Sequence, residues 1–178
     1  MLASDIANGF PTGVVMPADL VALCAFAEEH NGNTSGLFEF CSNGAFSAEC
    51  WFGDKELASK FAVFGQGPDG SLYALWMHVG PEAEKAPIVY LDSEGCGSKV
   101  IADNMREFLR LLAIGYDEPR RYPTLEPRMA ESASELRKWL NAKYRLAPPK
   151  IGSEIVSNSQ QRHPDLEKWI QAERNKKP

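Results

Sequence analysis

The sequence contains no long apolar run, and its longest apolar stretch, Leu20 to Ala27, is far shorter than the ~20 residues that a membrane-spanning helix needs. The first residues, Met1 to Asp5, also lack the basic stretch and apolar core of a secretory signal. We therefore expect a protein that crosses no membrane and acts in the cytoplasm.

Cysteine and histidine are scarce, with four and three residues in a chain of 178. The cysteines are Cys24, Cys41, Cys50 and Cys96, and the histidines are His30, His78 and His163. No two cysteines form a close pair, none has a histidine beside it, and no H-E-x-x-H motif brings two imidazoles to one metal. The sequence therefore predicts buried, reduced thiols, no metal centre and no bound cofactor.

Signatures of nucleophilic catalysis are also missing. The chain has no G-x-S-x-G elbow, and Cys96 has no neighbouring histidine that could act as its base. Asp92 and Glu94 flank the same glycine-rich turn as Cys96, and paired carboxylates can do acid–base work. Turn chemistry and solvation explain these two residues more simply, so no catalytic residue is predicted.

The one cofactor-like pattern is the G-x-G-x-x-G of Gly65, Gly67 and Gly70. A dinucleotide site needs a helix N-terminus directly after the glycines, where backbone N–H groups face the pyrophosphate. Here a short run of β-favouring residues follows and ends at Gly80. The glycines therefore predict a hairpin turn.

Charge is unevenly distributed along the chain, whose formal net charge is −5. Residues 1–117 contain 6 Lys and Arg against 16 Asp and Glu, which gives −10, whereas residues 118–178 contain 13 against 8, which gives +5. An acidic surface repels nucleic acid and attracts basic proteins, so direct nucleic-acid binding by the first part is disfavoured. A generic acidic cytosolic surface explains the same counts.

Apolar spacing predicts the secondary structure. A first helix opens at Pro17 to Asp19 and closes at Asn31–Gly32, and Leu37–Phe40 and Ala45–Trp51 alternate like a hairpin around the Ser42–Gly44 turn. Further strands are predicted at Phe61–Phe64, Ser71–His78, Pro87–Leu91 and Lys99–Ala102. The middle of the chain is thus expected to be an antiparallel meander of about four to six strands.

Helices are predicted to follow this meander. Asn104 and Glu107 are spaced as a capping box for a helix whose apolar face is Met105, Phe108, Leu109 and Leu112. An extended connector carries Pro119, Pro123 and Pro127. Ser132 and Glu135 then predict the cap of a third helix, with Leu136, Trp139, Leu140 and Tyr144 on one face, and a last helix begins near Pro164 with Leu166, Trp169 and Ile170.

The predicted fold class is α+β, with a central antiparallel sheet flanked by an N-terminal helix and C-terminal helices. Within it, Phe64–Trp76, Pro87–Gly95 and Asn104–Gly115 resemble the SUKH superfamily, specifically its Smi/Knr-type domain. The resemblance covers Pro17 to Asp117. We therefore expect a SUKH-like α+β domain over residues 1–117, with residues 118–178 as a basic helical C-terminal extension packed on the same domain.

The resemblance implies a domain without enzyme activity. Bacterial members of this superfamily resemble immunity proteins that bind and neutralise a cognate polymorphic toxin, often a nuclease, and fungal relatives are regulatory scaffolds. The family has no shared catalytic residues, so no site residue is carried over from it.

The expected partner is accordingly a basic toxin protein, met by acidic strand-connecting turns. The candidate contact residues are Asp69, Glu82, Glu84, Asp92 and Glu94. Two alternatives remain open: a regulatory or scaffolding adaptor whose region after Glu118 recruits another partner, and an enzyme that uses Asp92, Glu94 or His78.

Overall fold

A five-stranded antiparallel sheet forms the centre of the fold, with strands in the order β1-β2-β3-β4-β5. The computed structural model describes residues 1–115 and 131–176, so the proline-rich connector and the expected boundary after Asp117 lie outside the described residues. The strands are β1 (Glu39–Phe40), β2 (Phe61–Gln66), β3 (Leu72–Trp76), β4 (Ile88–Leu91) and β5 (Lys99–Ala102). The predicted α+β class and meander of four to six strands are therefore confirmed.

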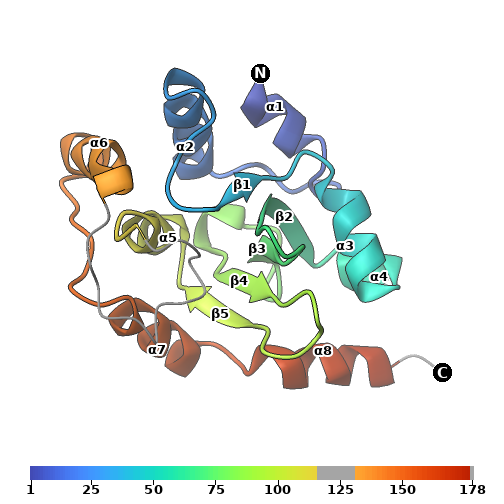
Figure 1. The fold of residues 1–178 in the computed structure, drawn as a ribbon. Coiled ribbons are helices and arrows are strands. Elements are labelled where there is room, and N and C mark those ends of the chain that lie inside the picture. The colour runs from blue at the N-terminus through green and yellow to red at the C-terminus, as the bar shows by residue number, and fades with distance from the viewer. Residues whose placement is uncertain (116–130, 177–178) are drawn as a thin grey trace.

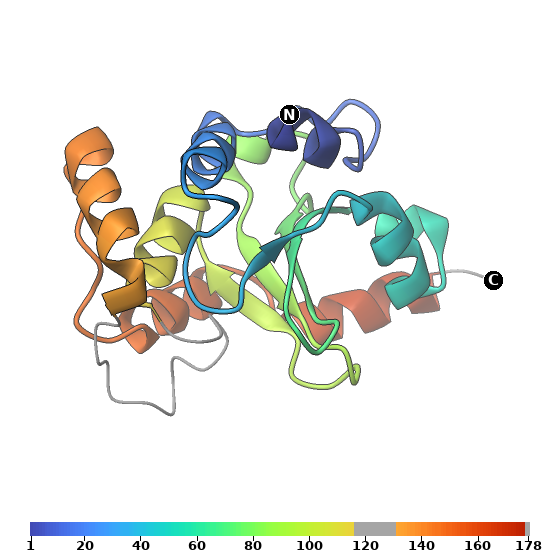
Figure 2. The same cartoon turned by 45° about the horizontal axis from the view of Figure 1, so that its top comes forward.

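Helices cover both faces of the sheet (Figures 1 and 2). One layer consists of α1 (Leu2–Ala7), α2 (Ala18–Glu29), α5 (Met105–Leu112), α6 (Ser134–Tyr144) and α7 (Ser153–Arg162). The other layer consists of α3 (Gly44–Phe52), α4 (Lys55–Ala58) and α8 (Leu166–Asn175). Two short 3-10 helices, η1 (Ala83–Lys85) and η3 (Glu131–Ala133), complete the described elements.

The two layers explain the apolar character of the strands. Successive strand residues point to opposite faces, so Val89 packs in the core cluster under α3 and α8, whereas Ile88 and Tyr90 pack in the cluster under α2 and α5. Because both faces are covered, every residue of β4 is buried. A strand buried on both faces has a nearly continuous apolar sequence, which is why these runs could be recognised.

All four predicted helices are also confirmed, as α2, α5, α6 and α8. Asn104 Oδ1 accepts a hydrogen bond from the Glu107 backbone N–H at 3.1 Å and caps α5, although the Glu107 carboxylate pairs with Arg110 instead of completing a capping box. The helix predicted to follow Pro164 is α8, capped by Asp165, whose side chain accepts from Lys168 N. The proposed cap of α6 is wrong: Ala133 occupies the N-cap, and Glu135 pairs with Lys138 at 2.6 Å.

The predicted hairpin over Leu37–Trp51 is wrong, since Gly44–Phe52 forms helix α3. Its buried residues Gly44, Ala48 and Phe52 recur at helical spacing, and Gly53 ends the helix in a left-handed conformation with φ +64°. β1 pairs instead with the end of β2, Glu39 opposite Gln66. Helices α1, α4 and α7 were not predicted.

The C-terminal helices contribute to the same core as the sheet. α6 and α7 bury Leu136, Leu140 and Ile155 in one cluster, and α8 buries Leu166 and Ile170 in the other. The division of the chain after Asp117 into a domain and an extension stays a prediction. None of the helices in the described part of the chain has both the length and the apolarity needed to cross a membrane.

Candidate functional site

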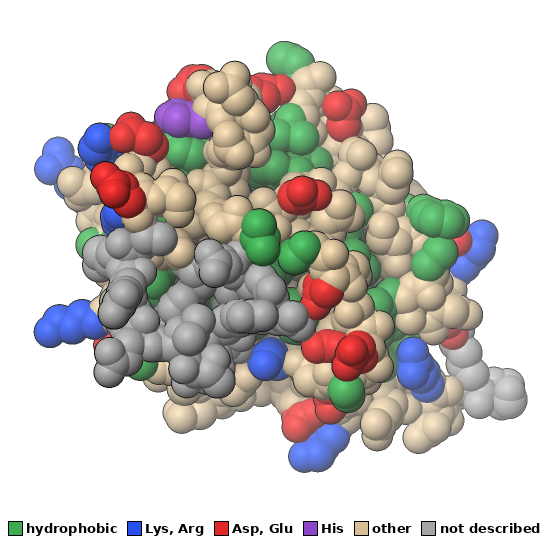
Figure 3. Space-filling model, viewed as in Figure 1, with side chains coloured by type: hydrophobic (Ala, Val, Ile, Leu, Met, Phe, Trp, Pro, Cys, Tyr) green, Lys and Arg blue, Asp and Glu red, His purple; other side chains and the backbone are tan. Residues whose placement is uncertain are grey.

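Four acidic residues gather at one end of the sheet. In an antiparallel meander alternate connections lie at the same end, so the β2–β3 and β4–β5 turns are neighbours. These turns carry Asp69, Asp92 and Glu94, and Glu39 of β1 joins them through its pairing with Gln66. We call Glu39, Asp69, Asp92 and Glu94 the acidic end. Figure 3 shows acidic side chains gathered over these turns.

The β2–β3 turn is a hairpin, as the glycines predicted. Gly67 N donates to Ser71 O at 2.8 Å, and Gly70 has φ +82°, a left-handed conformation that glycine adopts readily. Asp69 Oδ1 accepts from both the backbone N–H and the hydroxyl of Ser71. Strand β3 follows these glycines directly, in the place where a dinucleotide site would have the start of a helix.

The β4–β5 turn is held from both of its flanks. Trp51 Nε1, from α3, donates to Asp92 O at 2.9 Å. From α8, Glu167 Oε1 accepts the backbone N–H groups of Gly97 and Ser98 at 2.7 and 3.0 Å. Within the turn, Asp92 Oδ1 accepts from Glu94 N at 2.9 Å. These bonds fix the backbone that presents the acidic side chains.

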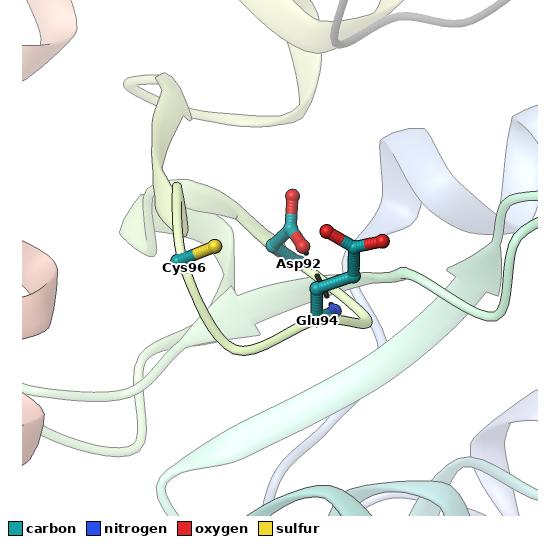
Figure 4. A group of neighbouring side chains, drawn as sticks. All are labelled: Asp92, Glu94 and Cys96. Atoms are coloured by element: carbon teal, nitrogen blue, oxygen red, sulfur yellow. Dashed lines mark hydrogen bonds between the residues drawn. The ribbon is translucent and has the colours of Figure 1, made fainter.

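Asp92, Glu94 and Cys96 project from this turn (Figure 4). Each offers one ligand atom, and these atoms lie within 4.8 Å of one another. The group is largely exposed and combines hard carboxylates with a soft thiol, a donor set that matches neither a calcium site nor a thiolate zinc site. Exposed acidic groups commonly occur without a metal, so we assign none here.

The other two candidate contact residues lie at the opposite end of the sheet, in the β3–β4 connection. Glu82 pairs with Lys85 at 2.7 Å, and the hydrogen bond from Lys85 lowers the pKa of the Glu82 carboxyl below its ordinary value. Glu84 Oε1 accepts from Ala18 N at 2.7 Å at the start of α2. The structure therefore brings Asp69, Asp92 and Glu94 together and separates them from Glu82 and Glu84.

The cysteines are free, as expected, but only two of them are buried. Cys24 and Cys41 lie in the core, and burial raises the pKa of the Cys24 thiol to about 12, which keeps it protonated. Cys50 and Cys96 are exposed, because α3 and the β4–β5 turn place them at the surface. The expectation of buried thiols is thus wrong for this second pair.

His78 lies just beyond β3, at the end of the sheet away from Asp92 and Glu94, so these three residues form no common site. Its ring stacks on Trp76 at a centroid distance of 4.0 Å and lies 5.7 Å from the ring of His163. His163 Nε2 lies 3.4 Å from Asp103 Oδ1. The chain thus brings together two histidines that are far apart in sequence.

His78 is expected to make the protein less stable in acid. Burial, with a smaller contribution from His163, lowers the pKa of His78 below 6.5, so below this pH the unfolded chain binds its proton more readily than the folded chain. With His78 neutral, above pH 6.5, the free energy of unfolding is at its full value. It decreases as the pH falls from 6.5 toward the lowered pKa of His78.

This expectation is checked by urea unfolding from about pH 7.5 to about pH 5.5, for the wild type and for His78→Phe. Phenylalanine keeps a ring against Trp76 but does not titrate. The variant should lose part of the decrease in stability, and the decrease that remains in the variant comes from groups other than His78. Identical pH profiles would exclude His78 as a source.

Comparison of the chain with family models, with curated proteins and with solved structures found no match.

Proposed function

We propose that this chain is a non-enzymatic protein-binding domain that acts in the cytoplasm and meets a basic partner protein with its acidic end. The observation that carries the proposal is the convergence of Glu39, Asp69, Asp92 and Glu94 on adjoining turns. Lys99 begins β5 close by, so the acidic end is predominantly, though not uniformly, negative.

The construction of the turns supports this role. A binding surface that is already ordered loses less conformational entropy when the complex forms. The Asp92–Ser98 turn is ordered by Trp51 on one side and Glu167 on the other. Clustered carboxylates on such a scaffold accelerate encounter with a positively charged surface and disfavour neutral or acidic partners.

The resemblance of residues 17–117 to the Smi/Knr-type domain supports a more specific proposal. We infer that the partner is a basic toxin, such as a nuclease, and that binding neutralises it. Nucleic-acid-binding grooves are positively charged because they contact phosphates. An acidic surface of this kind can occupy such a groove and exclude the nucleic acid.

Charge reversal at the acidic end is the direct test. The double variant Asp92→Lys/Glu94→Lys should associate with the partner about tenfold more slowly, because the steering field is reversed where the surfaces meet. The free energy of unfolding should change by less than about 0.5 kcal/mol at the exposed Glu94 and by more at Asp92, whose carboxylate accepts the Glu94 N–H within the turn. Higher salt should slow the wild type more than the variant.

The measurement uses the full chain as bait, identifies the protein that copurifies in equal amounts and follows association by surface plasmon resonance. Glu94→Lys and Glu82→Lys form a matched pair, since both replace an exposed glutamate but at opposite ends of the sheet. Equal on-rates for this pair would move the interface away from the acidic end. A partner whose toxicity persists in the complex would favour the adaptor over the immunity protein.

A further inference from the structure

A cleft of about 600 Å³ lies at the opposite end of the sheet from the acidic end. Its lining comes from the α1–α2 connection, α3, α4 and the chain after β3. Figures 1 and 2 both place the α1–α2 connection beside α3. Phe10, Phe61 and Met77 form its apolar floor, and all three are buried.

The architecture of the sheet explains why a cleft forms here. β1 pairs with Gly65 and Gln66 at the far end of β2, so no strand among the described residues lies beside Phe61 on that side. The space is bordered by α3, α4 and the Gly9–Val14 segment instead. Side chains from both core clusters, such as Met77 and Phe61, therefore reach the same cleft.

The lining of the cleft contains basic side chains, although residues 1–117 are acidic as a whole. Residues 1–117 contain six basic side chains, and two of them, Lys55 and Lys60, line the cleft together with Glu49. Lys55 pairs with Glu49 at 3.6 Å. The Lys60 ammonium has no ion pair or hydrogen bond within residues 1–115 and 131–176. The cleft therefore carries one positive charge that is not balanced there.

Large apolar side chains near the cleft point to a protein rather than a small molecule. Val15, Phe46 and Val79 are 79%, 69% and 87% exposed, and each is the direct neighbour in sequence of a lining residue. Large exposed apolar side chains next to lining residues are accessible to a protein segment that binds in the cleft. They extend the contact area beyond what a small ligand in the cleft would touch.

We propose that this cleft is a second docking site, which takes a segment of a protein partner carrying an apolar side chain next to a carboxylate. The apolar side chain would sit on Phe10, Phe61 and Met77, and the carboxylate would pair with the Lys60 ammonium. Glu82 and Glu84 follow the cleft residues Gly80 and Pro81 but are engaged with Lys85 and with the α2 N-terminus. The site does not depend on the acidic end.

The test titrates the full ¹⁵N-labelled chain with a capped peptide of sequence Gly-Leu-Asp-Leu-Glu-Gly, and separately with Gly-Leu-Lys-Leu-Lys-Gly. The acidic peptide should give saturable amide shifts at Ala48, Ser59, Lys60 and Met77, and the basic peptide should not. Lys60→Glu should lower the affinity for the acidic peptide roughly threefold to tenfold, as expected for reversal of one exposed charge contact. Lys85→Glu, which alters a lysine outside the cleft, should leave the affinity unchanged.

Val79→Asp is a second variant, at a highly exposed position where a substitution should change stability little, and it should also weaken binding of the acidic peptide. The proposal is overturned if neither peptide binds at millimolar concentration, if both bind equally, or if the shifts centre on Asp92 and Glu94.

Sedimentation of the free chain tests whether a second copy of the chain occupies the cleft. A dimer that Lys60→Glu dissociates would assign the cleft to that second copy and overturn the proposal. The double variant Asp92→Lys/Glu94→Lys should bind the acidic peptide at least as tightly as the wild type does. Failure of the proposal for this cleft is therefore distinguishable from failure of the proposal for the acidic end.

Discussion

Replacing Phe108 by alanine is expected to lower the free energy of unfolding by about 3 to 5 kcal/mol, the range measured for large buried aromatic side chains. Phe108 is fully buried on α5. Its ring centroid lies 5.5 Å from that of Phe64, 5.7 Å from Phe38 and 5.9 Å from Tyr73. These rings come from the sheet and its flank and are held by other contacts, so they cannot close the cavity that the substitution leaves.

Phe46→Ala is the matched control, because it makes the same chemical change on a side chain that is 69% exposed. Its effect should stay within about 0.5 kcal/mol. Urea unfolding followed by circular dichroism measures both variants, and the midpoint should fall only for Phe108→Ala. Similar midpoints for the two variants would contradict the packing of α5 against the sheet.

Helix α5 and strands β2 to β5 could be predicted because their signals are local. Asn104 and the apolar spacing from Met105 to Leu112 define a helix start and one buried face within a single segment. The strands are buried on both faces, and glycine-rich turns or the Met77–Pro87 connection separate them, so each appears as a short apolar run. Neither inference needs knowledge of what the segment packs against.

Of the helices that were not predicted, α1 and α7 lack such signals. α1 buries only Ile6, and α7 buries only Ile155, Val156 and Ser159 within a largely polar sequence. A short helix with few apolar positions is stabilised mainly by tertiary packing. In α7 that packing is against β5, whose position relative to this helix is not encoded locally.

The candidate site was predictable only in part for a similar reason. That Asp69, Asp92 and Glu94 lie in turns follows from the sequence, but which turns adjoin depends on the order of strands in the sheet. The hydrogen bonds that Glu167 accepts from the backbone N–H groups of Gly97 and Ser98 join residues about seventy positions apart. His78 and His163 are even farther apart in sequence, so no local pattern indicates the contact between their rings.

Helix α3 provides the sharpest example of a tertiary effect that overrides a local pattern. The alternation of Ala45–Trp51 favours a strand, and Ser42–Gly44 favours a turn. Gly44 is instead the first residue of a helix packed on β2, where a Cβ atom would lie 2.4 Å from the Val63 carbonyl oxygen. The missing side chain of Gly44 is what allows the helix N-terminus to approach the strand backbone.

Gly44→Ala is therefore expected to destabilise the protein by about 1 to 3 kcal/mol, because the new methyl group must displace α3 from β2. The sign is diagnostic, since exchanging glycine for alanine at an unhindered helical position stabilises by up to ~1 kcal/mol. Cys50→Ala, at an exposed position of the same helix, is the control and should change little. Thermal and urea unfolding of the three proteins, the wild type and the two variants, measure the difference.

An unchanged or more stable Gly44→Ala variant would mean that α3 does not contact β2 through Gly44. The support that Trp51 of the same helix gives to the Asp92 turn would then also be in doubt.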